Sequence, residues 1–232
     1  MKVSIGSPTL RRYMTNYFSI GADARIGLGS EKHRGDSACC NKCCYCWEGF
    51  KKLFFTSTMT MNQVLLKVMK VTDTGEKNIV SVPIQENTDI GGNYFVGDPA
   101  SIVFLNIGTY MGGRAHPWKE ASDELGLISK TEELKAEFKP ESHGDGLIEI
   151  FSFSSLLRLS LETMFSGNAS RLAQDSGPFR IIFQESKNKD IVTYMNIDGE
   201  YYKLIKPKEI SIKLAEAPFY PSIRIVHRNI AN

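Results

Sequence analysis

The amino-acid sequence predicts an α+β fold that is mainly β, built from two packed antiparallel or mixed sheets with a few peripheral helices. About nine segments combine β-branched or aromatic residues with apolar alternation, the pattern typical of strands. Only two segments have the apolar spacing of an amphipathic helix. A parallel doubly wound sheet would need helices between most of its strands, and the sequence does not supply them.

The first third of the chain predicts strands around one helix. Residues Tyr17 to Leu28 mix β-formers with glycines, which predicts a short strand, a turn and a second extended piece. Residues Ala38 to Phe55 keep apolar positions at helical spacing and lack turn residues, so they predict a helix. Strands predicted at Gln63 to Val71 and at Asn78 to Pro83 flank the turn-forming segment TDTGEKN, as in a hairpin. Another strand is predicted at Ser101 to Gly108.

The middle of the chain predicts a surface insertion followed by a strand and a helix. Residues Lys119 to His143 are highly charged, which predicts an exposed connection with some helix around Thr131 to Phe138. Gly146 to Phe153 alternates like a strand. Ser154-Ser155 then supplies an N-cap for an amphipathic helix that passes through Phe165 and stops near Gly167.

The last third returns to strands, at Phe179 to Glu185, Asp190 to Ile197, Tyr201 to Ile205 and Glu209 to Leu214. Between the second and third of these lies an Asp-Gly pair, which is a strong hairpin signal because glycine adopts positive φ without steric cost. The turn places Asp198 and Glu200 on either side of the glycine. The residues alone leave two interpretations open: an ordinary exposed turn, or a turn that carries acids into a site.

Composition places the chain among globular proteins. It has 232 residues, 42% hydrophobic and 23% charged, with a formal net charge of +2, so neither disorder nor a nucleic-acid partner is indicated. No Pro/Gly/Ser-rich linker divides the chain, which favours one domain. No apolar run is long enough for a membrane span or a secretory signal. Together with five cysteines confined to eight positions, these features lead us to expect the cytosol.

The cysteine cluster CCNKCCYC allows two main interpretations. Cys40, Cys43 and Cys46 have CxxC spacing, which is compatible with a zinc or iron site, but the only nearby candidate for a fourth ligand is His33. In a helix, Cys39 would share one face with Cys43 and Cys46, and these thiols would pack against the core as small hydrophobes. We favour packing and expect no zinc; reactive thiols near Lys42 are a third possibility.

Several short motifs together resemble the accessory domain of eukaryotic diacylglycerol kinases. In chain order they are NYFSIGADARI from Asn16, the region before Trp47-Glu48-Gly49-Phe50, IVFLNIGTYMGG from Ile102, Trp118, GDGLIEI from Gly144, RLAQ from Arg171 and IDGEYY from Ile197. The chain departs from the family at Thr109, where the family usually has proline, and at Tyr201-Tyr202, where it has Pro-Trp. The resemblance implies an N-terminal extension at residues 1–15, the accessory domain at 16–214 with the charged insertion at about 119–143, and a C-terminal tail at 215–232.

The resemblance implies the accessory half of an ATP-dependent kinase that converts diacylglycerol to phosphatidic acid. The family's nucleotide-binding half carries a Gly-Gly-Asp-Gly-Thr loop, in which backbone N–H groups approach the phosphates. This chain contains no such loop, so ATP and Mg²⁺ would require that separate half, in cis or in trans, and the isolated chain is expected to be inactive. The implied partners are diacylglycerol and the membrane surface, with a cytoplasmic, peripheral location and no nucleic acid.

The resemblance also assigns roles to individual residues. Asp198 would be the base that faces the acceptor hydroxyl, while Glu200 and Asp145 would belong to an acid and water network linked to magnesium. Asn106 and the Gly112-Gly113 pair would line the cleft beside the nucleotide. From the residues alone, Asp145 is equally a loop residue before a strand, and Asn106 with the glycines an ordinary exit turn.

The residues alone predict that Arg171 caps the preceding helix or lies on the surface, and a contact with phosphate is the alternative.

Two other functions of the whole protein remain open at this point. A non-catalytic lipid-binding or interaction module fits the absent glycine loop, and a metal-binding protein would be organised by the cysteine cluster.

Overall fold

A computed structural model describes the chain over residues 9–55, 58–81, 93–95, 98–113, 115–120, 127–129, 138–142, 144–162, 165, 167–186, 190–214 and 221–231. Its strands are β1 (Thr9–Tyr13), β2 (Tyr17–Gly21), β3 (Leu65–Thr72), β4 (Gly75–Ser81), β5 (Asn93–Phe95), β6 (Ser101–Leu105), β7 (Leu127–Ser129), β8 (Ile148–Phe153), β9 (Ser170–Asp175), β10 (Phe179–Phe183), β11 (Val192–Ile197), β12 (Glu200–Leu214) and β13 (Pro221–Ala231). Its helices are α1 (Ala22–Glu31), α2 (Ala38–Phe54), α3 (Met61–Val64), α4 (Pro117–Glu120) and α5 (Leu156–Glu162).

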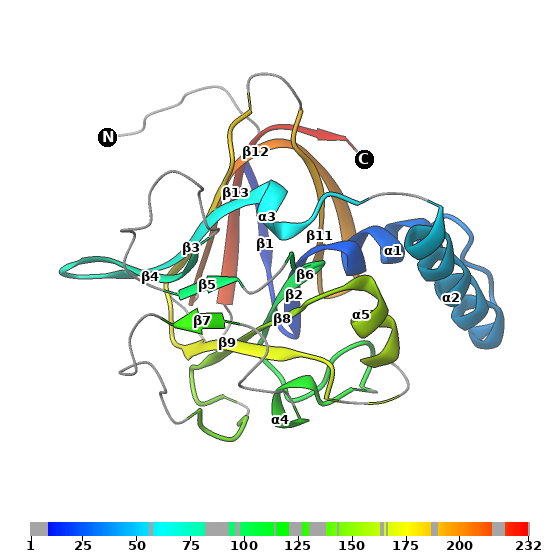
Figure 1. Ribbon diagram of the computed structural model, residues 1–232, viewed down its shortest axis with the longest axis horizontal. Coiled ribbons are helices and arrows are strands. Elements are labelled where there is room, and N and C mark those ends of the chain that lie inside the picture. Colours follow the sequence, from blue (N-terminus) through cyan, green and yellow to red (C-terminus); the bar gives the residue numbers. More distant parts are fainter. Residues whose placement is uncertain are drawn as a thin grey trace.

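The strands join into one large sheet that curves round on itself, with α1, α2 and α5 gathered on one side (Figure 1). The strand order is β7-β5-β4-β3-β10-β12-β11-β2-β6-β8-β9, and β13 pairs with both β12 and β1. The neighbours are antiparallel except for β4 and β5. The prediction of a mainly β, α+β fold is therefore confirmed. The two halves of the sheet are continuous because β12 pairs with β11 through its first part and with β10 through residues 209–212.

Strand β12 corrects one prediction, because the sequence predicts two strands where the structure has a single bent one. Lys206 has a φ of 52°, and the register with β13 shifts between Pro207 and Glu209. Proline cannot donate to a ladder and is tolerated at such bulges. The Lys206–Pro207 segment therefore bends β12 without ending it, and this bend lets one strand serve both halves of the sheet.

Both faces of the sheet's centre are buried. On β6, Ile102 and Phe104 belong to the core enclosed by the curved sheet, whereas Val103 and Leu105 belong to a second core beneath the helices. Successive side chains of a strand point to opposite faces. This placement explains why all five residues of β6 are buried and why its sequence is a continuous apolar run.

Helix α1 was wrongly predicted as a turn followed by an extended piece. The misleading residues are Gly27 and Gly29, which resemble turn signals in the sequence but lie at close helix contacts. A β-carbon at Gly27 would overlap the ring of Tyr201 on β12, and one at Gly29 would overlap the carboxyl of Glu48 on α2. The glycines thus let α1 approach both neighbours closely.

Helix α2 matches the predicted helix, but the predicted packing of its thiols is wrong. Cys43 and Cys46 are exposed, and the side chain of Cys39 lies outside the described residues. Among the residues of α2 whose burial is described, Glu48 and Gly49 are buried, on the face that meets α1. Cys43 and Cys46 lie on other sides of the helix, so they do not act as core hydrophobes.

Two further predictions concern helices in the second half of the chain. Helix α5 begins as predicted, since Ser155 Oγ accepts a hydrogen bond of 3.2 Å from the backbone N–H of Arg158. The helix predicted at Thr131 to Phe138 lies outside the described residues, apart from Phe138. The ring of Phe138 packs edge-on against Trp118 at a centroid distance of 5.0 Å.

Candidate functional site

Four of the predicted site residues lie at the same ends of neighbouring strands. This row of strand ends is called one edge of the sheet below. The pairing Tyr17↔Leu105 aligns the start of β2 with the end of β6, while Ile197 pairs with both Phe18 and Glu200. On the other side, Leu105 pairs with Glu149 near the start of β8. The register therefore places Asp198, Glu200, Asn106 and Asp145 at the same ends of neighbouring strands, although they are far apart in sequence.

Asp198 is bound tightly at this edge by the segment that joins β1 to β2. One carboxylate oxygen accepts hydrogen bonds from Thr15 N at 2.6 Å and Thr15 Oγ1 at 2.8 Å, and the other from Asn16 N at 2.8 Å and Tyr17 N at 2.9 Å. The residue has a φ of 52°, a left-handed conformation that aspartate tolerates better than most residues. Asp198 thus ties the β11–β12 turn to the β1–β2 connection.

Asn106 binds the same connection from its other side. Its side-chain amide donates to Thr15 O at 2.8 Å, and its backbone N–H donates to Asn16 O at 2.8 Å. The backbone N–H of Asp198 adds a bond to Tyr17 O at 3.0 Å. Residues at the ends of two strands, Asn106 after β6 and Asp198 after β11, therefore converge on the Thr15–Tyr17 backbone.

The other predicted residues are more exposed. Glu200 accepts a hydrogen bond from Tyr202 Oη at 2.5 Å and lies 3.5 Å from Arg12 Nε. Asp145 accepts one from Leu147 N at 2.8 Å. Gly112 and Gly113 lie in a short loop closed by Tyr110 and Ala115, with φ values of 72° and 84°. They are exposed glycines in an exit turn, which is the simpler of their two interpretations.

The two acids that the resemblance links to magnesium, Asp145 and Glu200, belong to different strands of this edge. Among the residues that the structure describes, no group of three or more His, Cys, Asp or Glu side chains is arranged to hold a metal ion. Asp145 precedes β8, whereas Glu200 begins β12, and three strands lie between β8 and β12 in the sheet order.

The sequence analysis did not identify Glu149, which is buried on β8 close to Asp145. Desolvation raises the pKa of its carboxyl above the ordinary value, and the charges of Asp145 and Glu141 raise it further. Gln174 Nε2 donates to it at 3.0 Å. The sequence did contain one sign of this buried acid. Glu149 is the only charged residue in the apolar strand segment GLIEI, and all six residues of β8 are buried.

A second acid that the sequence analysis did not identify as a site residue, Asp23, lies in the first turn of α1 and is buried. Tyr110 Oη donates to its Oδ2 at 2.8 Å, while its Oδ1 has no hydrogen-bond partner among the described residues. Burial raises the pKa of Asp23 above its ordinary value of 3.8. Burial also raises the pKa of Tyr201 to about 12, helped by the charge of Asp23.

This burial predicts how stability depends on pH. Because the folded protein has the higher Asp23 pKa, the protonated form is favoured by folding, and this contribution is present below pH 4 and is lost as pH rises through the folded pKa. We expect Asp23→Asn, which cannot ionise, to gain stability relative to the wild type as pH rises from 4 to neutrality. Urea unfolding at several pH values measures this difference, and a constant difference would contradict it.

Removing the hydroxyl partner is expected to have the opposite effect. Tyr110→Phe leaves the buried carboxylate of Asp23 without its donor, so we expect a loss of about 1–3 kcal/mol in the free energy of unfolding at neutral pH. In the Asp23→Asn background the same substitution should cost less. Equal costs in the two backgrounds would mean that the 2.8 Å hydrogen bond contributes little.

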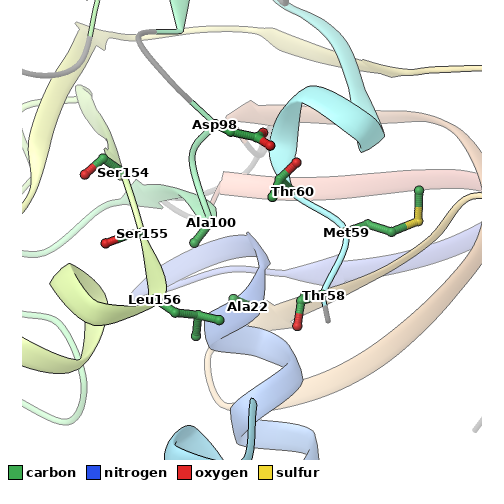
Figure 2. A pocket seen from close by; sticks show the side chains of 9 residues that line it. All are labelled: Ala22, Thr58, Met59, Thr60, Asp98, Ala100, Ser154, Ser155 and Leu156. Carbon is green, nitrogen blue, oxygen red and sulfur yellow. The ribbon is translucent and has the colours of Figure 1, made fainter. Parts of the chain in front are cut away.

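A pocket of about 210 Å³ is lined by the nine residues labelled in Figure 2. It lies next to the end of β2 and the start of β6, whereas Asp198 lies next to the start of β2. Its walls come from the first residue of α1, the segment before α3, the segment before β6, and the start of α5. The lining residues are Ala22, Thr58, Met59, Thr60, Asp98, Ala100, Ser154, Ser155 and Leu156. The six predicted site residues lie elsewhere, so this pocket is distinct from the edge that carries them.

Arg171 neither caps a helix that precedes it nor lies free on the surface. Its Nε donates to Trp118 O at 2.8 Å, and its guanidinium lies 5.1 Å from the centroid of the Trp118 ring. Together with Phe138 these side chains line a second pocket of about 450 Å³. Arg171 therefore organises the end of α4 on β9.

Comparison with known proteins agrees with the motifs. Residues 13–201 match the model of the diacylglycerol kinase accessory domain. The chain is 27% identical over 225 residues to diacylglycerol kinase 5 of Arabidopsis thaliana, covering 91% of this chain and 39% of that protein. It is 28% identical over 216 residues to diacylglycerol kinase 1 of Oryza sativa subsp. japonica, covering 88% and 38%.

The chain thus spans about two fifths of the length of these relatives. Within the described part of the chain, no helix is long and apolar enough to cross a bilayer. The family match covers most of the chain, including the segments of β2, β6, β8 and β11 that build the sheet edge. This chain belongs to the diacylglycerol kinase accessory domain family.

Proposed function

We propose that this chain is the accessory half of an ATP-dependent diacylglycerol kinase, which transfers a phosphoryl group to the free hydroxyl of diacylglycerol to give phosphatidic acid. The observation that carries the proposal is the sheet register, which gathers Asn106, Asp145, Asp198 and Glu200 at one edge. The family match and the kinase names of the relatives support the same reading. ATP and Mg²⁺ are bound mainly by the separate nucleotide-binding half, because the acids described here do not form a three-ligand metal group.

Phosphoryl transfer to an alcohol needs an in-line arrangement and a group that accepts the hydroxyl proton. In a loose transition state this proton is lost late, so the position of the acceptor matters more than its basicity. Asp198 is positioned by four hydrogen bonds, and as the base it would exchange one of these donors for the substrate hydroxyl. Asp145 and Glu200, both exposed, would face the nucleotide and its magnesium from the same edge.

The four hydrogen bonds also favour a second role for Asp198, that of a positioning residue. Both of its carboxylate oxygens already accept hydrogen bonds from the Thr15–Tyr17 segment, so Asp198 would hold this segment in place and the segment, not Asp198, would contact the substrate. The two roles differ in one measurable respect. A base is required for turnover in a folded enzyme, whereas a positioning residue affects turnover through the order of its segment.

The proposal is tested with a chimera that carries this chain in place of the matching region of the Arabidopsis kinase. We expect the chain alone to make no phosphatidic acid from diacylglycerol vesicles, ATP and Mg²⁺, and the chimera to make it. Asp198→Asn in the chimera should lower kcat by at least about a hundredfold if it is the base. Asp73→Asn is the matched control, since Asp73 is an exposed acid in the β3–β4 turn, outside this edge.

Each outcome separates the candidate functions. A folded chimera without activity would favour the competing function, a non-catalytic lipid-binding or interaction module. Activity of the chain by itself would show that nucleotide binding had been assigned to the wrong half. If Asp198→Asn keeps turnover while Asp145→Asn loses it, the acid role moves to Asp145.

A further inference from the structure

The exposed side of α2 carries an unusual stripe of apolar side chains. Cys40, Cys43, Trp47, Phe50 and Phe54 follow one another at alternating intervals of three and four residues, so they share one face of the helix. Trp47 is 58% exposed, Phe50 45% and Phe54 62%. These five residues are called the α2 stripe below. Large aromatic side chains on a monomer's surface mark an interaction site when they are contiguous.

The aromatic residues of the α2 stripe contact one another. The rings of Trp47 and Phe50 stack with centroids 5.7 Å apart, and those of Phe50 and Phe54 lie 4.6 Å apart. Phe55, just beyond the helix, is 72% exposed and its ring centroid lies 6.0 Å from that of Phe50. The result is one continuous aromatic surface.

The opposite face of α2 fixes the helix to the body of the protein. Glu48 and Gly49 are buried, and Gly49 lies next to the side chain of Ile26 on α1. Glu48 also pairs with Lys51 and with Lys52, the latter at 3.2 Å. Figure 1 shows α2 standing at the outside of the molecule, beside α1. The stripe is therefore held outward on a packed helix.

The charge of this segment is basic. Residues 38–55 contain Lys42, Lys51 and Lys52 but only one acid, Glu48. A helix with tryptophan and phenylalanine on one face and lysines beside them is typical of helices that lie in the interface of an anionic bilayer.

We propose that the α2 stripe is the membrane-contact surface of this protein, and that Trp47, Phe50, Phe54 and Phe55 insert into the headgroup region of anionic bilayers. The choice of a bilayer as the partner rests on the proposed function, because diacylglycerol is a membrane lipid. Lys51 and Lys52 contribute electrostatic attraction to acidic headgroups, which salt weakens. The helix thereby fixes which side of the domain faces the membrane.

The test uses the whole chain with vesicles of phosphatidylcholine alone or mixed with phosphatidylserine, both without diacylglycerol. We expect binding to the mixed vesicles, weaker binding to the neutral ones, and a blue shift of Trp47 emission as its ring leaves water. Trp118 is buried, with 1% exposure, so its emission should stay constant. An unchanged Trp47 emission on bound vesicles would overturn the proposal.

The variant Phe50→Ser/Phe54→Ser keeps Trp47 as the probe and removes two inserting rings. Because the double variant no longer removes two large apolar side chains from water, we expect vesicle affinity to fall at least about tenfold. Tyr13→Ser is the matched control, since Tyr13 is 69% exposed on β1, and it should bind like the wild type. Circular dichroism and thermal unfolding establish that all variants are folded.

Four results are decisive. The proposal is overturned if the double variant binds vesicles with wild-type affinity. It is also overturned if the wild type is a dimer and the double variant is a monomer, because a second copy of the chain would then occupy the stripe. Vesicle binding lost in the double variant, together with an inactive chimera, would support the membrane surface and reject the kinase function. An active chimera with unchanged vesicle binding in the double variant would do the reverse.

Discussion

Asp198→Ala is expected to lower the free energy of unfolding by about 2–4 kcal/mol, a large loss for a partly exposed turn residue. The substitution removes a carboxylate that accepts four hydrogen bonds from Thr15, Asn16 and Tyr17. Hydrogen bonds to charged groups contribute more than neutral ones, and alanine is also less tolerant of the φ of 52° at this position. Urea unfolding followed by circular dichroism measures the loss.

Matched variants separate the contributions. Asp198→Asn keeps one acceptor oxygen and tolerates the left-handed conformation, so its cost should fall between those of the wild type and alanine. Thr15→Val removes only the side-chain donor. Asp145→Ala, at an exposed acid that accepts a hydrogen bond from Leu147 N, should cost less than about 1 kcal/mol. Equal stability of Asp198→Ala and the wild type would mean that the carboxylate does not hold the β1–β2 connection.

Gly27→Ala is expected to destabilise the protein by about 2–4 kcal/mol, although alanine is normally the better helix former. A methyl group at this position in α1 would overlap the ring of Tyr201, and the packed interface between α1 and β12 leaves little room for relaxation. Gly49→Ala in α2 is the matched control, because the nearest atom to its new methyl would be Ile26 Cδ1 at 3.9 Å. We expect that control to gain roughly 0.5–1 kcal/mol.

A double-mutant cycle tests the cause. If the clash is with Tyr201, then Gly27→Ala should be nearly neutral or stabilising in a Tyr201→Ala background, giving a strong coupling between the two sites. Thermal unfolding of the four proteins provides the measurement. Additive costs would show that the loss comes from another contact of α1.

Local patterns in the sequence predicted single helices, strands and turns better than they predicted how these elements pack against one another. The hairpin of β3 and β4, helix α2 and the Ser155 cap followed from short-range signals. Helix α1 was missed because Gly27 and Gly29 resemble turn residues, and their role depends on neighbours from distant segments. The exposure of Cys43 was missed for a related reason: a helical pattern does not show which face will meet another helix.

The candidate site shows the same division. That Asp198 lies in a tight turn was readable from the Asp-Gly pair alone. Its proximity to Asn106 depends on the pairing Tyr17↔Leu105, between strands far apart in the chain; the family resemblance supplied that expectation. Neither source predicted the four hydrogen bonds to Asp198, since the donors are mostly backbone N–H groups whose direction is set by the path between β1 and β2.

The pairing of β1 with β13 has a consequence for biosynthesis. Thr9 pairs with Val226, so the first strand leaves the ribosome long before its partner is translated. At roughly 5–20 residues per second, the delay is about 10–40 s. During that interval an unpaired strand edge is open to association with other nascent chains. We therefore expect a chaperone that shields extended segments to raise the yield of native protein during translation.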